Sequence, residues 1–246
     1  MSTSTHTDTD FQVSHPSEPS GTVLAGFSSF GLAGLTAVDF LIEHLDLEQQ
    51  GHVTVEGLPV ITPFTEGRPR HPVRLYSRDD LDITVLVAEL FVPASVGQAF
   101  ADAVLDWTED GGVEEVVVIA GVPVPHGPDA HRTFYVATED YHDRRLRDQA
   151  VPPMGTGFLD GVNAALMARG IDSPLGVCIY VTPVHAQAPD VDAAIRLVET
   201  IEAVYELGID PSPLTEFADR VRQYYTDLAA RMEEKETETP EDRMYM

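Results

Sequence analysis

Residues 22–208 alternate between short apolar runs and segments with helical spacing, and this alternation limits the chain to a few folds. Strand patterns occupy residues 22–27, 52–57, 71–91 (two strands around the turn 77–80), 113–122, 132–138 and 175–183, and helix patterns occupy 32–47, 94–112, 139–149, 157–170 and 190–208. Strands alternating with helices are typical of a sheet covered by helices on both faces. The sequence therefore predicts a three-layer α/β sandwich whose sheet is largely parallel and contains a hairpin.

Local signals mark the ends of several helices. Gly111 follows the helical pattern at 94–112, and glycine is common just beyond a helix. Asp190 stands directly before the long helical pattern that ends near Gly208, in the position of an N-cap. These residues predict where the chain turns between the helical and sheet layers.

The chain changes character after Pro211. Ser212 is positioned as an N-cap and Pro213 as the first helical residue, which predicts a helix over 211–235. Its apolar seam consists of Leu214, Phe217, Val221, Tyr224 and Leu228. Such a seam forms when a helix packs against a partner. Packing on its own domain is favoured over an intermolecular coiled coil, and both interpretations remain open.

Both ends of the chain are polar. Residues 1–20 lack the basic and apolar regions of a signal peptide and are interpreted as a disordered arm. The α/β domain is predicted at 21–210, and a flexible tail at 236–246. No run of eighteen apolar residues occurs, so no membrane segment is expected. With one cysteine, Cys178, the chain cannot form an internal disulfide, and a cytoplasmic location is expected.

The charge of the chain restricts its partners. Forty-one acidic residues oppose fifteen basic ones, a formal net charge of −26, and the only lysine is Lys235. Such a charge would repel nucleic-acid phosphates, so DNA and RNA are not expected as partners. Acids spread along the whole chain, with almost no lysine, resemble the cytosolic proteins of extreme halophiles.

Motifs that usually carry chemistry are incomplete in this sequence. The segment GFSSFG has Phe30 where a nucleophile elbow needs glycine. The glycines of GTGFLDG are one residue too far apart for a dinucleotide-binding loop. His126, His131 and His142 lie in loop-like segments with no metal-binding spacing, and a surface position is the favoured interpretation. His185 also lies in a loop and could line a cleft, but this alternative is disfavoured. We therefore expect no catalytic residues, no metal and no cofactor.

The glycine pattern of the turns carries a family resemblance. GFSSFGLAG, GTGFLDGVNAALMARGI, CIYVTP and PDVDAAIRLVETIEAVYELGID occur in that order within residues 21–210. In order and spacing these motifs resemble the archaeal proteasome assembly chaperone family, whose members work without ATP. Structural turn positions, where glycine permits positive φ or close backbone approach, are assigned to Gly26, Gly31, Gly34, Gly155, Gly157 and Gly161. The resemblance implies a phosphorylase-like sandwich without the catalytic set, and homo-oligomers.

The chain ends on Met244, Tyr245 and Met246, after a tail rich in acids and threonine. This ending matches the hydrophobic–tyrosine–any-residue motif with which proteasome activators and some of these chaperones dock between α-subunits of the core particle. A terminal carboxylate can pair with a pocket lysine, while the tyrosine ring buries apolar area. We therefore expect a non-enzymatic chaperone or adaptor that binds the core-particle α-ring through these residues and also self-associates.

An enzymatic alternative uses the same fold. A small-molecule hydrolase or ligase would place its cleft near residues 155–161, and its activity would survive loss of the tail. Convergent acids and bases in a deep pocket would distinguish this alternative from the chaperone.

Overall fold

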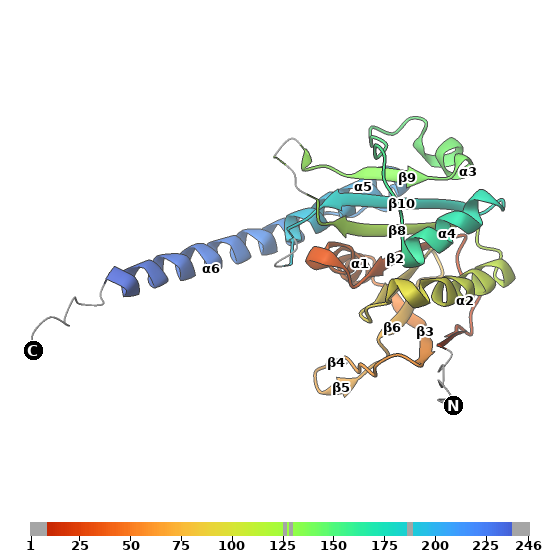
Figure 1. Ribbon diagram of the computed structural model, residues 1–246, viewed down its shortest axis with the longest axis horizontal. Coiled ribbons are helices and arrows are strands. Elements are labelled where there is room, and N and C mark those ends of the chain that lie inside the picture. Colours follow the sequence, from red (N-terminus) through yellow and green to blue (C-terminus); the bar gives the residue numbers. More distant parts are fainter. Residues whose placement is uncertain (1–8, 125–126, 128–129, 186–188, 238–246) are drawn as a thin grey trace, which may run out of the picture. The chain divides into compact units, whose positions relative to one another are not determined.

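The computed structural model describes residues 9–237, apart from 125–126, 128–129 and 186–188 (Figure 1). The chain divides into two compact units, one ending at Ile209 and one beginning at Asp210. The first unit holds the sheet and its helices, and the second consists mainly of one long helix. The two units are described separately.

The first unit is built on an eight-stranded sheet in the order β1-β3-β6-β7-β2-β8-β10-β9. Its strands are β1 (Asp10–Ser14), β2 (Thr22–Phe27), β3 (Glu48–Glu56), β6 (Val73–Ser77), β7 (Ile83–Ala88), β8 (Glu115–Val122), β9 (Phe134–Ala137) and β10 (Gly176–Pro183). A separate two-stranded hairpin contains β4 (Phe64–Thr65) and β5 (Arg68–Pro69).

The sheet is mixed, so the prediction of a largely parallel sheet was wrong. Neighbouring strands from β7 through β2 and β8 to β10 run parallel. The pairings β1–β3, β3–β6, β6–β7 and β10–β9 are antiparallel. A short connection, such as that between Ser77 and Ile83, can join only antiparallel neighbours, whereas a parallel pair needs a long crossover. The mixed order also gives no support to a phosphorylase-like arrangement.

Helices cover both faces of the sheet and make the sandwich three layers thick. They are α1 (Ala33–His44), α2 (Gly97–Asp110), α3 (Glu139–Tyr141), the π-helix η4 (His142–Leu146), α4 (Gly161–Ile171) and α5 (Val191–Tyr205), with short 3-10 turns η1 (Phe30–Leu32) and η2 (Ala94–Val96). Helices α1 and α5 pack together on one face, and α2 packs with α4 on the other.

The core lies on both sides of the central strands. Val23, Val116 and Val118 belong to one apolar cluster with Phe100 of α2 and Leu166 of α4. All residues of β7 and β10 are buried, as expected for strands covered on both faces. Burial on both faces explains why these strands occur as continuous apolar runs in the sequence.

Strand β1 corrects the interpretation of residues 1–20 as a disordered arm. Residues 10–14 pair antiparallel with β3, and the ring of Phe11 packs edge-on against Phe100 at 5.2 Å. Residues 1–8 lie outside the described part of the chain. The five-residue strand was missed because it is half polar and has no pattern of its own until it pairs with β3.

The second unit is the helix α6 (Ser212–Thr237). The backbone carbonyl of Pro211 accepts the first helical hydrogen bond, from Thr215 N–H at 3.1 Å. The carboxylate of Asp210 accepts from Ser212 N–H at 2.9 Å. The capping side chain is therefore Asp210, and the assignment of Ser212 as N-cap was wrong. The described part of the helix extends to Thr237, two residues beyond the predicted end at 235.

Candidate functional site

The three residues proposed to bind a partner, Met244, Tyr245 and Met246, lie outside the described residues. The structure describes the helix that precedes them, α6, as far as Thr237. Of the predicted seam, Leu214 is buried, whereas Phe217 and Tyr224 are exposed; the side chain of Leu228 lies outside the described part. The guanidinium of Arg220 covers one side of the Phe217 ring at 5.9 Å. The described half of α6 therefore presents aromatic groups to solvent.

Gly26 and Gly34 lie where α1 crosses the sheet. A Cβ atom on Gly26 would stand 2.6 Å from the backbone oxygen of Gly34, and one on Gly34 would stand 2.2 Å from the backbone oxygen of Ile119. Real Cβ atoms do not approach backbone so closely. These two glycines allow α1 to pack directly on β2 and β8.

The other turn glycines differ from one another. Gly31 and Gly161 have φ values of 65° and 54°, a region that glycine enters without steric cost. Gly155 and Gly157 have negative or extended φ, and a Cβ atom on either would meet nothing within 4 Å. Neither of the two reasons proposed for glycine applies at these two positions.

A histidine–carboxylate pair lies at the carboxyl end of β10. The carboxylate of Asp190 accepts from the backbone N–H of His185 and contacts its ring Nδ1, both at 3.0 Å. Its other oxygen accepts from Ala193 N–H at 2.9 Å, which confirms Asp190 as the N-cap of α5. The His185 side chain is 73% exposed, as expected. An imidazole oriented by a carboxylate can transfer a proton, so an enzymatic hypothesis would begin here.

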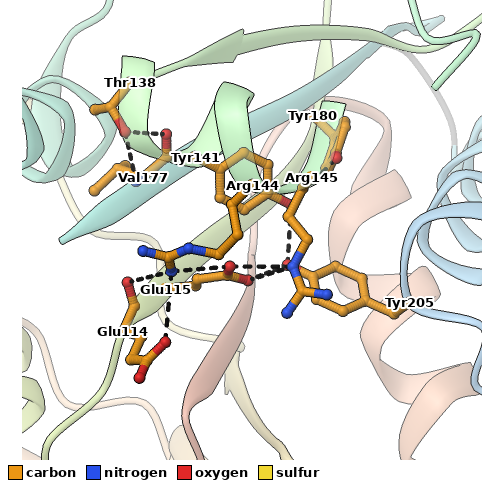
Figure 2. Close-up of polar contacts among 9 residues, drawn as sticks. All are labelled: Glu114, Glu115, Thr138, Tyr141, Arg144, Arg145, Val177, Tyr180 and Tyr205. Carbon is orange, nitrogen blue, oxygen red and sulfur yellow. Dashed lines mark hydrogen bonds and ion pairs between the residues drawn. The ribbon is translucent and has the colours of Figure 1, made fainter. Parts of the chain in front are cut away.

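A buried polar cluster lies at the opposite end of the parallel strands (Figure 2). Glu115, the first residue of β8, is 1% exposed, and its carboxylate accepts hydrogen bonds from three side chains. Arg144 Nη1 donates at 3.0 Å, Arg145 Nε at 3.1 Å and the Tyr205 hydroxyl at 3.2 Å. Figure 2 shows both arginines approaching the carboxylate from the π-helix, while Tyr205 comes from α5.

Three tyrosine hydroxyls extend this cluster into the core. Tyr141 lies between Tyr205 and Tyr180, with oxygen–oxygen distances of 2.9 and 3.2 Å. Burial raises the pKa of each of these hydroxyls well above its ordinary value, and burial likewise raises the pKa of the Cys178 thiol. Groups with raised pKa values stay protonated near neutral pH. The cluster therefore ties η4 and α5 to β8 through neutral hydroxyls and one ion pair network.

The sequence contains only a weak signal for this cluster. Glu115 is the second of two adjacent acids directly before an apolar run, and Arg144 and Arg145 stand in a short polar segment. An acid buried at the start of a strand needs a charged partner, but the sequence alone does not say which residue that is.

A groove of about 440 Å³ lies between β3 and the segment 58–72. It is lined mainly by apolar side chains, with Arg70 and His71 as its basic residues. Glu89 accepts from Arg70 Nη2 at 2.5 Å and from the fully buried Arg74 at 2.9 Å. Gly155 and Gly157 do not line this groove. The groove can accommodate an apolar group beside a cation that Glu89 already compensates.

Within the described residues, no group of three or more histidine, cysteine or acidic side chains is placed to hold a metal ion. None of the helices in that same part of the chain has the length and apolarity to cross a membrane.

The mixed sheet between two helical layers, followed by a long helix, defines a class of α/β proteins with a helical C-terminal extension. Within that class, the chain belongs to the PAC2 family, whose model matches residues 23–229. The match spans most of the α/β unit and much of α6.

Solved structures of similar fold include proteins of archaea. PbaA of Pyrococcus furiosus, an archaeal homologue of proteasome-assembly chaperone, superposes with a TM-score of 0.84 at 22% identity, covering 93% of this chain and 95% of its own. PbaB of the same organism, an archaeal proteasome activator, superposes with a TM-score of 0.73 at 18% identity, covering 89% of this chain and 99% of its own. An uncharacterized protein of Methanocaldococcus jannaschii is 20% identical over 207 residues, 84% of each chain. These likenesses establish the fold.

Proposed function

We propose that this protein is a non-enzymatic, ATP-independent chaperone or adaptor of the proteasome core particle. Its membership of the PAC2 family over residues 23–229 carries the proposal. The similarity in fold to PbaA, a homologue of proteasome-assembly chaperone, and to PbaB, a proteasome activator, supports the same role.

The proposed contact with the core-particle α-ring is the tripeptide Met244–Met246. Its carboxylate would pair with a lysine, the Tyr245 ring would bury apolar area while its hydroxyl keeps a partner, and Met244 would fill an apolar site. Helix α6 supports this assignment because it carries the chain to within nine residues of Met246.

Self-association through the α/β unit is the second part of the proposal. Several tails on one oligomer could engage the α-ring together, which raises the affinity without new contacts. The net charge of −26 fits a cytosol rich in salt, where charge repulsion between copies is screened.

A pull-down from native cytosol at molar salt tests the proposal. The full chain is compared with a chain that ends at Arg243. We expect the full chain to recover α-subunits of the core particle and the shortened chain to lose them. Recovery of no α-subunit by the full chain would contradict a proteasome role. Equal recovery by both chains would contradict only the tail contact.

Light scattering tests the second part independently. The full chain should have the mass of an oligomer at micromolar concentration in high salt, and the shortened chain should have the same number of subunits. A monomeric mass for the full chain would contradict self-association.

A further inference from the structure

The α/β unit contains several segments without Asp, Glu, Lys or Arg, although acids alone make up 41 of the 246 residues. Three of them are residues 19–38, 90–101 and 149–159. Parts of these segments form connections at the surface, where charged residues are normally most frequent.

The uncharged connections meet at one end of the sheet. Strands β2 and β7 are parallel neighbours that end together, with Phe27 beside Ala88, and Ser28 N–H donates to the Ala88 carbonyl at 2.8 Å. The connections that follow them therefore begin side by side. Parallel strands place such connections at their shared carboxyl edge.

The third connection reaches the same place through the start of α4. A Cβ atom on Gly97, the first residue of α2, would stand 2.5 Å from the carbonyl carbon of Gly161, the first residue of α4. Gly161 also lies beside Ala94 of η2. Residues 149–159, which lead into α4, thus end next to the connection that follows β7.

Each of the three connections carries an exposed phenylalanine. Phe30 is 59% exposed, Phe91 is 63% exposed and Phe158 is fully exposed. An exposed aromatic ring on an uncharged surface is typical of an interaction site, because burying the ring in a partner releases water from apolar area. We call the surface formed by these residues and their connections the uncharged edge.

We propose that the uncharged edge is the contact surface between two copies of this chain. Two copies each carrying a charge of −26 repel one another wherever acidic surfaces meet. The three connections themselves carry no charge, so two copies can approach there with the least repulsion. In a symmetric dimer the same face would meet itself, so that the rings of Phe30, Phe91 and Phe158 would be buried against their equivalents. The inference rests on the self-association proposed above and names its surface.

Salt dependence follows from the same reasoning. Burial of apolar rings does not weaken when charges are screened, and salting-out ions strengthen it. Association through the uncharged edge should therefore be at least as strong at molar salt as at low salt.

The test compares Phe91→Asp and Phe158→Asp with Ile171→Asp in the full-length chain. Ile171 is 72% exposed at the end of α4, and its neighbour Gly170 packs on Val177 near the start of β10, so the control adds the same charge at the opposite end of the parallel strands. Light scattering over a concentration series measures the association constant. Circular dichroism and the thermal midpoint verify that each variant is folded.

We expect Phe91→Asp and Phe158→Asp each to weaken association by about 30-fold or more, and Ile171→Asp to leave it unchanged. If the parent oligomerises and folded Phe variants keep its mass, the assignment of this surface is overturned while self-association stands. If the Phe variants keep the mass of the parent oligomer but no longer capture the core particle, the assignment is also overturned. The uncharged edge would then be a surface that binds the core particle. A monomeric parent would overturn self-association itself, together with this inference.

Discussion

The hydroxyl of Tyr205, the last residue of α5, donates a 3.2 Å hydrogen bond to the carboxylate of Glu115, the first residue of β8 and ninety positions earlier in the chain. This contact joins the end of the outer helix to the start of a central strand. Because Arg144 and Arg145 bind the same carboxylate, one buried charge fixes three elements at once.

Replacing the charge of Glu115 should therefore destabilise the fold. Glu115→Gln leaves two arginines without their counter-charge, although each is about one-third exposed and can reach water, so we expect a loss of about 2 kcal/mol in the free energy of unfolding. Tyr205→Phe should cost about 1 kcal/mol. Denaturant unfolding measures both. The control is Glu114→Gln, whose exposed side chain lies 3.7 Å from Arg144; a comparable loss there would contradict the special role of Glu115.

Gly34 should tolerate no side chain. A Cβ atom there would lie 2.2 Å from the Ile119 carbonyl oxygen, so Gly34→Ala forces α1 away from β8 and should cost about 2–3 kcal/mol, despite the higher helix propensity of alanine. Gly155→Ala is the matched control, because the space around Gly155 is open, and it should change stability by less than about 0.5 kcal/mol. Thermal unfolding of both variants checks this. If Gly34→Ala and Gly155→Ala were equally stable, α1 would be able to move away from β8 at little cost in free energy.

Asp190 should stabilise the fold in a pH-dependent manner. Burial alone would raise its pKa, but hydrogen bonds from the backbone N–H groups of His185 and Ala193 outweigh burial and hold the pKa below its ordinary value of 3.8. A carboxyl whose pKa is depressed by folding stabilises above the unfolded value, and this contribution fades as the pH falls through the folded value.

Asp190→Ala should accordingly cost about 1–2 kcal/mol between about pH 5 and 7. The difference from the parent should shrink at pH values below 3.8, measured by denaturant unfolding over a pH series. Asp192→Ala, in the first turn of the same helix, serves as the control. If the difference in unfolding free energy between Asp190→Ala and the parent stays constant down to the lowest pH measured, the charge of Asp190 contributes nothing to stability.

Binding of the tail should need both the Tyr245 side chain and the terminal carboxylate of Met246. Tyr245→Ala should cost about 2 kcal/mol per tail in binding to purified core particle, from lost ring burial and an unpaired pocket group. One residue added after Met246 should be as harmful, because it moves the carboxylate away from its partner. A surface-binding titration at low and molar salt measures both, with Thr239→Ala as a control that leaves the tripeptide intact.

Binding should persist at molar salt. There the Debye length is about 3 Å, which screens long-range repulsion but not a contact inside a partly buried pocket. If Tyr245→Ala and the extended tail bind like the parent, the terminal tripeptide is not the contact.

The sequence predicted most elements because their signals are local. Continuous apolar runs identified β2, β8 and β10, since strands buried on both faces need apolar side chains at every position. Helical spacing and the side chain of Asp190 located α5, because an N-cap and its helix are a few residues apart. The family resemblance followed from the order of such local motifs and is confirmed by membership of the PAC2 family.

Only the tertiary structure decided what depends on residues far apart in the chain. A run of apolar residues does not indicate the direction of its strand, so the mixed sheet was not predicted. Strand β1 has no sequence signal, and only the packing of Phe11 against Phe100 identifies it as part of the fold. The partners of Glu115 come from positions about thirty and ninety residues away. Likewise, Phe30 and Phe91 are separate apolar residues in the sequence, and they follow parallel strands that end side by side. Phe158 is brought to the same edge by the contact between the starts of α4 and α2.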